Sequence, residues 1–182
     1  MALKATIHKM QLQVADLNRH YYAEHTMTLA RHPSESEERM MVRLLAFAHH
    51  ATETLYFGRG VSTADEPDIW QKDPTGAIEL WIQLGQPDEK SIRKACGQAR
   101  KVVIYSYSGH GALVWWEQVG RKLKELKNLA VVDIDASSVT SLAALSAKNM
   151  TLSCTIQDSS TYMASLDESV EIVMETRQSL PA

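Results

Sequence analysis

The fold is decided by residues 65–94, which read DEPDIWQKDPTGAIELWIQLGQPDEKSIRK. The middle of this stretch, residues 78–84, lies between Gly76 and Gly85 and has the alternation expected of a β-strand, in which successive side chains point to opposite faces. One face is wholly apolar and consists of Ile78, Leu80, Ile82 and Leu84. The other face carries Glu79, Trp81 and Gln83. We therefore predict a well-anchored central strand that presents one carboxylate beside a large ring and an amide.

The carboxylate of Glu79 needs a partner, because burial of an unpaired charge is costly. Three further acids, Asp65, Glu66 and Asp68, come just before the strand and can meet it. Acids that converge with an amide at a sheet are ligands for a hard divalent cation such as Mg²⁺. In the alternative, structural interpretation, Asp68 is a turn residue after Pro67, and Glu79 pairs with an arginine of a neighbouring strand.

The length and composition of the chain are those of an ordinary globular protein. Its 182 residues are 45% hydrophobic and 23% charged, and we predict one domain over residues 1–182. The formal net charge of −3 gives no general attraction to nucleic acid or to anionic membranes. A site for a polyanion must therefore be a local basic patch.

Cysteine usage and hydropathy favour a cytoplasmic protein. Cys96 and Cys154 have neither CxxC nor zinc-site spacing, so we expect reduced core residues. Residues 1–10 lack the long apolar run of a signal peptide or an anchor, and no run reaches the ~18 apolar residues of a membrane span. No heptad run demands an oligomer, and we expect a monomer.

Hydrophobic periodicity predicts strands and helices along the whole chain. Strands are expected over residues 6–14, 21–29, 55–57, 78–84, 102–107, 129–134, 152–156 and 170–176. Helices are expected over residues 34–50, 88–99, 112–124 and 138–148. The first two strands form an N-terminal β-hairpin. The predicted fold class is α/β, as one α+β mixed sheet with helices on its faces.

The first helix has a strong start in residues 33–37, PSESE. Ser34 and Glu37 have the spacing of a capping box, in which each side chain bonds the other's backbone N–H. Glu38 lies in line with the apolar stripe that begins at Met41. It therefore either points inward as a metal ligand or complements the helix dipole.

Basic residues on the helices allow two interpretations. Arg39 and Arg43, spaced i and i+4, form either a solvated face or a phosphate clamp. Lys90, Lys94 and Lys101 lie on roughly the opposite side from the apolar stripe of the second helix. This placement favours a solvated face unless a bound polyanion lies there.

Five longer segments extend these patterns almost from end to end. They are ALKATIHK, RHYYAEHTMTLARHPSESEERMMVRLLAFA, DEPDIWQKD, GAIELWIQLGQPDEKSIRKAC and MTLSCTIQD. Together they resemble the bacterial YaeQ protein family, which has been related to the PD-(D/E)xK nuclease superfamily as a variant with an altered motif. The resemblance implies a restriction-endonuclease-like core.

In that superfamily, an acid on the first helix, an aspartate at one strand and an acid-x-lysine on the next strand hold one or two Mg²⁺ ions. By resemblance, the helix acid, the PD pair and the acid of (D/E)xK correspond to Glu38, Pro67-Asp68 and Glu79. Trp81 stands where the motif has lysine, so this sequence departs from the pattern at that position.

A second alignment takes residues 76–80 as the glycine-led strand that carries the motif aspartate, and Gln83 then stands where the second acid belongs. Both alignments keep Glu79. In both, a basic group must come from elsewhere. Lys90 and Lys94 are the nearest candidates, and Arg39 is a further one.

The resemblance leads to a first functional prediction, a nuclease dependent on Mg²⁺ or Mn²⁺. Its metal ligands would be Glu38, Asp68 and Glu79. Gln83 would place the water, and Lys90 or Lys94 would meet the scissile phosphate. Contacts to nucleic acid would come from Arg39, Lys90, Arg93 and Lys94. Without the motif lysine, metal binding can survive while hydrolysis is slow or absent.

The two alternative predictions involve no catalysis. A second prediction is a catalytically silent nuclease-fold module that binds nucleic acid or a protein partner. A third is an interaction protein whose acids serve only the structure, because a fold does not fix a function.

Overall fold

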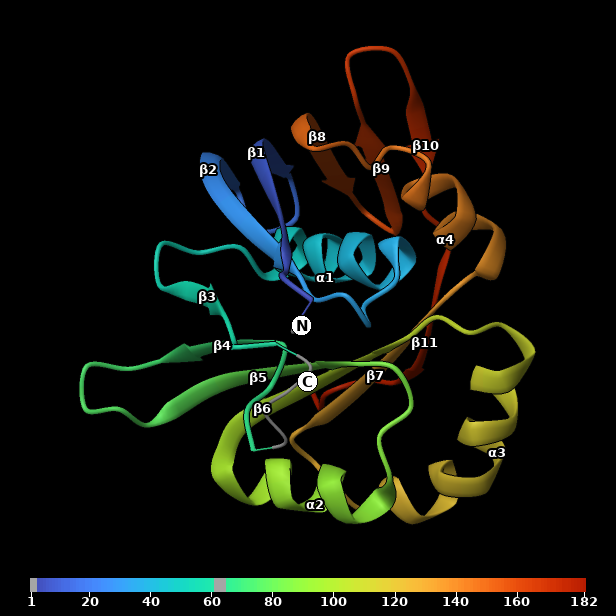
Figure 1. Ribbon diagram of the computed structural model, residues 1–182. Coiled ribbons are helices and arrows are strands. Elements are labelled where there is room, and N and C mark those ends of the chain that lie inside the picture. The colour runs from blue at the N-terminus through green and yellow to red at the C-terminus, as the bar shows by residue number, and fades with distance from the viewer. Residues whose placement is uncertain (1–2, 61–64) are drawn as a thin grey trace. The chain divides into compact units, whose positions relative to one another are not determined.

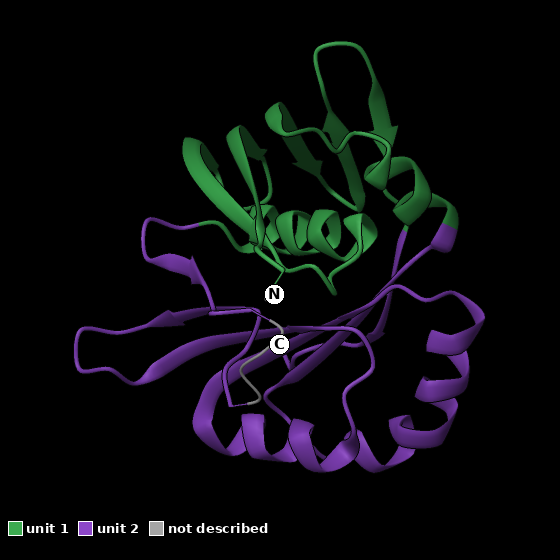
Figure 2. Ribbon diagram, viewed as in Figure 1, with its two compact units in different colours: residues 1–51, 137–173 green, residues 52–136, 174–182 purple. Residues whose placement is uncertain are grey.

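The structure, a computed structural model, describes residues 3–60 and 65–182. In these residues it has four helices and eleven strands, which form two sheets. The chain divides into two compact units (Figure 2). Unit 1 comprises residues 1–51 and 137–173, and unit 2 comprises residues 52–136 and 174–182. The mixed α and β composition is confirmed, but the prediction of one mixed sheet is wrong. The single domain stays a prediction.

Unit 1 contains a five-stranded sheet. Its strands are β1 (Thr6–Asp16), β2 (Tyr21–Arg31), β8 (Asn149–Gln157), β9 (Ser160–Ala164) and β10 (Ser169–Glu171). They lie in the order β10-β9-β8-β1-β2 (Figure 1). The predicted hairpin of β1 and β2 is confirmed. The other neighbour of β1 is β8, which runs parallel to it and pairs Leu152 with Leu12. Two segments far apart in the sequence therefore form the middle of this sheet.

The core of unit 1 lies between this sheet and α1 (Glu37–His50). Alternate residues of β1, Met10, Leu12 and Val14, are buried. Helix α1 is buried at every position from 40 to 48, so its burial is not confined to one stripe. Its N-cap is Ser36, whose side chain accepts from the Arg39 N–H. The capping box predicted at Ser34 is wrong, because the helix begins two residues later.

Unit 2 contains a six-stranded sheet. Its strands are β3 (Leu55–Phe57), β4 (Ile69–Lys72), β5 (Ile78–Leu84), β6 (Ala99–Ser106), β7 (Leu129–Ile134) and β11 (Met174–Gln178). They lie in the order β11-β7-β6-β5-β4-β3 (Figure 1). Strands β5, β6 and β7 are parallel to one another, whereas β3, β4 and β11 are antiparallel to their neighbours. The predicted central strand, β5, thus lies where the parallel and antiparallel parts meet.

Two helices, α2 (Glu89–Gln98) and α3 (His110–Leu123), pack on this sheet. Asp88, where the second helix was predicted to begin, is the N-cap of α2 and accepts from the Ser91 N–H at 2.7 Å. Trp81 and Trp115 are buried in the core that the two helices cover.

The C-terminal third departs most from the prediction. The strand expected over residues 170–176 is two strands, β10 and β11, in different sheets. Helix α4 (Ala136–Ala143) is shorter than expected, and β9 was not predicted. Cys96 and Cys154 are free thiols, as expected. Among the described residues, no helix is both long and apolar enough to span a membrane.

Candidate functional site

The predicted residues of unit 2 come together most closely in a depression of about 330 Å³ at β5 and α2. Two lysines, two polar side chains, an acid and an apolar floor line it. They are Lys90, Lys94, Gln83, Ser91, Asp65, Trp81 and Ala95. We call this feature the lysine depression.

Local structure places these groups. The Asp88 cap fixes the start of α2, and residues spaced i and i+4, such as Lys90 and Lys94, lie on the same side of a helix. Trp81 and Gln83 share a face of β5, and the indole Nε1–H of Trp81 lies 3.4 Å from the Gln83 amide oxygen. The depression therefore has an aromatic floor, an amide and two ammonium groups.

Lys94 already has an anionic partner. Its Nζ lies 2.7 Å from Asp65 Oδ1, and both side chains are exposed. The hydrogen bond from Lys94 lowers the pKa of the Asp65 carboxyl below its usual value. Because exposed ion pairs are weak, a bound anion can replace Asp65 as the partner of Lys94.

Arg93 does not join the two lysines. Its guanidinium donates to Glu89 and Glu125 and, at 2.9 Å, to the backbone oxygen of Lys122. The bonds to Glu125 and then Glu89 raise its pKa. Arg93 therefore links α2 to the end of α3.

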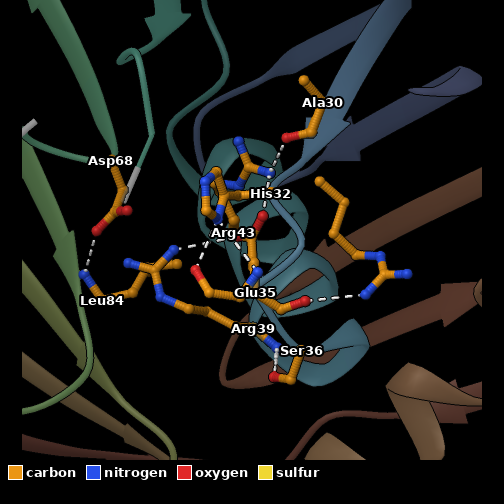
Figure 3. A network of polar contacts seen from close by, with 10 residues as sticks. Ala30, His32, Glu35, Ser36, Arg39, Arg43, Asp68 and Leu84 are labelled. Atoms are coloured by element: carbon orange, nitrogen blue, oxygen red, sulfur yellow. Dashed lines mark hydrogen bonds and ion pairs between the residues drawn. The ribbon is translucent and has the colours of Figure 1, made fainter. Parts of the chain in front are cut away.

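Asp68 and Glu79 lie at opposite ends of β5. The Asp68 carboxylate is buried and accepts from the Leu84 N–H at 2.9 Å (Figure 3). Glu79 is five residues earlier on the strand, about 17 Å away at 3.3–3.4 Å per residue. It pairs with Arg100 of the neighbouring strand β6 at 3.3 Å, which is the structural alternative for this residue. The structure does not bring Asp68 and Glu79 together.

The remaining predicted residues, Glu38 and Arg39, belong to α1 in unit 1. Glu38 is an exposed acid in the first turn, where it complements the helix dipole. Arg39 donates to Glu35 at 3.1 Å. Within residues 3–60 and 65–182, no group of three or more His, Cys, Asp or Glu side chains is arranged to hold a metal ion.

Residues 1–174 match the family model described as YaeQ protein. The chain belongs to the YaeQ family. It is similar to the "Uncharacterized protein YaeQ" of Salmonella typhi, with 43% identity over 178 residues that cover 98% of each chain. The protein of that name from Escherichia coli (strain K12) is 43% identical over 172 residues, or 94% of this chain and 95% of the relative.

Two solved structures of YaeQ proteins share the fold. The crystal structure from Xanthomonas axonopodis pv. citri is 44% identical and has a TM-score of 0.94 over 97% of this chain and 99% of its own. The structure from Pseudomonas syringae is 31% identical and has a TM-score of 0.91 over 96% and 97% of the two chains. The resemblance to the YaeQ family is thus confirmed, whereas the relation to PD-(D/E)xK nucleases stays a prediction.

One acid of this YaeQ chain escaped the sequence interpretation. Glu35 is buried, and its two carboxylate oxygens accept from Arg39 at 3.1 Å and from Arg43 at 2.9 Å (Figure 3). Arg31 donates to the Glu35 backbone oxygen at 2.9 Å. The solvated face predicted for Arg43 is wrong, because its side chain is only 5% exposed. The i, i+4 spacing of Glu35 and Arg39 was visible, but it did not reveal that the Glu35 carboxylate is buried.

Proposed function

We propose that this YaeQ-family chain is a nuclease-fold module that binds nucleic acid at the lysine depression without cutting it. The observation that carries the proposal is the pair of exposed ammonium groups, Lys90 and Lys94, beside Gln83 and Ser91. Lysine ammonium groups and hydroxyls are common partners of backbone phosphates. The restriction-endonuclease-like core is part of the proposal and rests on the family resemblance.

The donor set predicted for Mg²⁺ does not fit one ion. Mg²⁺ takes oxygen ligands at about 2.0–2.1 Å, and paired ions lie only about 3.5–4 Å apart. Asp68 and Glu79 are separated by most of the length of β5, and Glu79 is engaged by Arg100. We therefore assign no step to a metal ion held by these acids.

The lysine depression predicts weak, salt-sensitive binding. The formal net charge of the chain is −3, so attraction must come from the local cations. For single strands, the logarithm of the association constant falls with the logarithm of salt concentration with a slope of about −0.7 per neutralised phosphate. Two lysines therefore give a slope near −1.4.

The test is fluorescence anisotropy with labelled single- and double-stranded DNA and RNA at low salt. The double variant Lys90→Gln, Lys94→Gln should lose most of the affinity and its salt slope. The matched control is Lys124→Gln, Lys127→Gln, which removes two lysines of unit 2 outside the depression. Equal binding by both double variants, or no binding by the native chain, would refute the proposal.

A nuclease dependent on Mg²⁺ or Mn²⁺ is the second candidate. It is favoured by Pro67-Asp68, which places a buried carboxylate against the backbone of β5 beside Gln83. The test combines calorimetric titration of Mn²⁺ with a cleavage assay on the same nucleic acids. Cleavage that Asp68→Asn abolishes while Glu79→Ala preserves it would establish this second function and would overturn binding without hydrolysis.

A further inference from the structure

An aromatic ladder crosses three strands of unit 2. Tyr56 of β3 is the cross-strand neighbour of Trp70 on β4, and Trp70 is the neighbour of Trp81 on β5. The ring centroids are 5.8 Å apart for the first pair and 6.2 Å for the second. At one end of the ladder Trp81 is buried, with 6% of its surface exposed, and at the other end Tyr56 is 41% exposed. The ladder therefore leads from the core to solvent at the edge strand β3.

A cation accompanies the ladder. The Nζ of Lys72 lies 3.8 Å from the centroid of the Trp70 ring, a cation–π contact on the same face of the sheet. The indole Nε1–H of Trp70 is enclosed and has no hydrogen-bond acceptor among the described residues. We call Tyr56, Trp70 and Lys72 the aromatic strip.

The aromatic strip is continuous with the lysine depression. Trp81 packs edge-on against Trp70 and also lines the depression. Lys72, Lys90 and Lys94 thus accompany one row of rings. Of the two nearby acids, Glu79 is paired with Arg100, and Asp65 is the exposed partner that a bound phosphate would replace at Lys94.

We infer that the aromatic strip binds the unpaired bases of a single-stranded nucleic acid whose phosphates contact Lys90 and Lys94. Bases stack on aromatic side chains irrespective of sequence, and cations beside the rings track the backbone. A duplex keeps its bases stacked on one another and cannot offer a base face to Tyr56. This inference rests on the proposed function and specifies its ligand as single-stranded.

Three tyrosine variants test the inference by anisotropy with a single-stranded oligonucleotide of about 10 nucleotides, within the range of known single-strand sites. Tyr56→Ala should weaken binding about 5- to 150-fold, which corresponds to about 1–3 kcal/mol for one stacked base. Tyr56→Phe keeps the ring and should retain the native affinity. The control is Tyr162→Ala, which removes a strand tyrosine of equal exposure, 42%, from unit 1.

The outcomes separate the two proposals. Binding that depends on Lys90 and Lys94 but is equal in Tyr56→Ala and Tyr162→Ala would overturn the aromatic strip and leave the lysine depression intact. Loss of affinity in Tyr56→Phe equal to that in Tyr56→Ala would also overturn it, because stacking needs only the ring. Absence of any binding by the native chain would overturn both. A preference for duplex over single strand would contradict the aromatic strip alone.

Discussion

At the scale of single residues, Glu35 organises the polar interior of unit 1. It is 3% exposed at its side chain, and it meets two guanidinium groups through different carboxylate oxygens. A third arginine, Arg31, reaches its backbone oxygen. Removal of one partner from a buried ion pair is strongly destabilising, because the other charge stays buried without that partner. The acid is therefore a structural residue of this fold.

We expect Glu35→Gln to lower the free energy of unfolding by about 3–5 kcal/mol, the usual cost of breaking a buried ion pair. The measurement is urea unfolding followed by circular dichroism. Glu38→Gln, an exposed acid three residues later, is the control and should stay within about 0.5 kcal/mol of the native chain. Similar losses in both variants would show that the burial of Glu35 carries no special weight.

His49, near the end of α1, is the second residue with a measurable consequence. Its Nε2 is hydrogen-bonded to the Thr161 hydroxyl at 3.1 Å. Burial lowers the pKa of this imidazole to about 4, although the charge of Asp16 acts in the opposite direction. The folded protein therefore holds His49 neutral well below the pH at which an unfolded histidine becomes charged.

The sign of the resulting pH dependence is definite. The unfolded chain binds a proton at His49 near pH 6.5 and the folded chain only near pH 4, so stability falls as the pH drops through this window. We expect His49 to contribute a loss of about 2 kcal/mol between pH 7 and pH 5. Urea unfolding of the native chain and of His49→Gln at both pH values measures it. Parallel pH profiles would contradict the assignment.

At the scale of elements, local sequence patterns were sufficient to predict a helix or strand wherever one periodicity dominates. The alternation of residues 78–84 and the cap at Asp88 gave β5 and the start of α2 correctly. Ser34 and Ser36 fit a helix start equally well by residue type, and only the backbone path decides between them. Asp68 comes shortly before Glu79 in the sequence, and the two were expected to meet. Because β4 and β5 are antiparallel, Asp68 lies at the far end of β5, beside Leu84.

Two helical glycines give opposite predictions. A Cβ on Gly120 of α3 would lie 2.8 Å from the ring of Trp116, whereas one on Gly97 of α2 meets nothing within 4 Å. Gly97→Ala should therefore stabilise the protein by up to about 1 kcal/mol, through helix propensity alone. Gly120→Ala should destabilise it by about 1–3 kcal/mol through overpacking.

Thermal unfolding by calorimetry measures the pair of alanine variants, with each glycine serving as the control for the other. Stabilisation by both variants would mean that the Trp116 ring moves aside without cost, and destabilisation by both would contradict the prediction for Gly97. A stabilising effect of Gly120→Ala alone would contradict the packing argument directly.

At the scale of the whole molecule, the partition into two sheets could not be read from the sequence. Pairing partners are chosen by long-range packing, and nothing in the stretch around Leu12 specifies that it lies beside Leu152. Residues 169–178 show the same limit, because two short strands only a few residues apart, β10 and β11, join different sheets. The lysine depression was foreseen only as separate residues, since its assembly depends on how α2 packs on β5.

Strand β11 is the C-terminal contribution to unit 2. It pairs with β7, and the Gln178 amide nitrogen donates to the backbone oxygens of Leu123, Leu126 and Leu129. A chain that ends at Val173 should show faster hydrogen exchange in β7 and in the end of α3, because these bonds are lost. A chain that ends at Gln178 keeps them and is the control. Unchanged exchange in the shorter chain would show that β11 does not protect these elements.

The parallel pairing of β1 with β8 has a consequence for synthesis. The hairpin of β1 and β2 is synthesised more than a hundred residues before β8, a delay on the order of ten seconds at an elongation rate of about 5–20 residues per second. During that interval the backbone N–H and C=O groups on the edge of β1 that later pairs with β8 have no strand beside them. Until β8 is made, this edge of the nascent hairpin is therefore open to pairing with a strand of another chain.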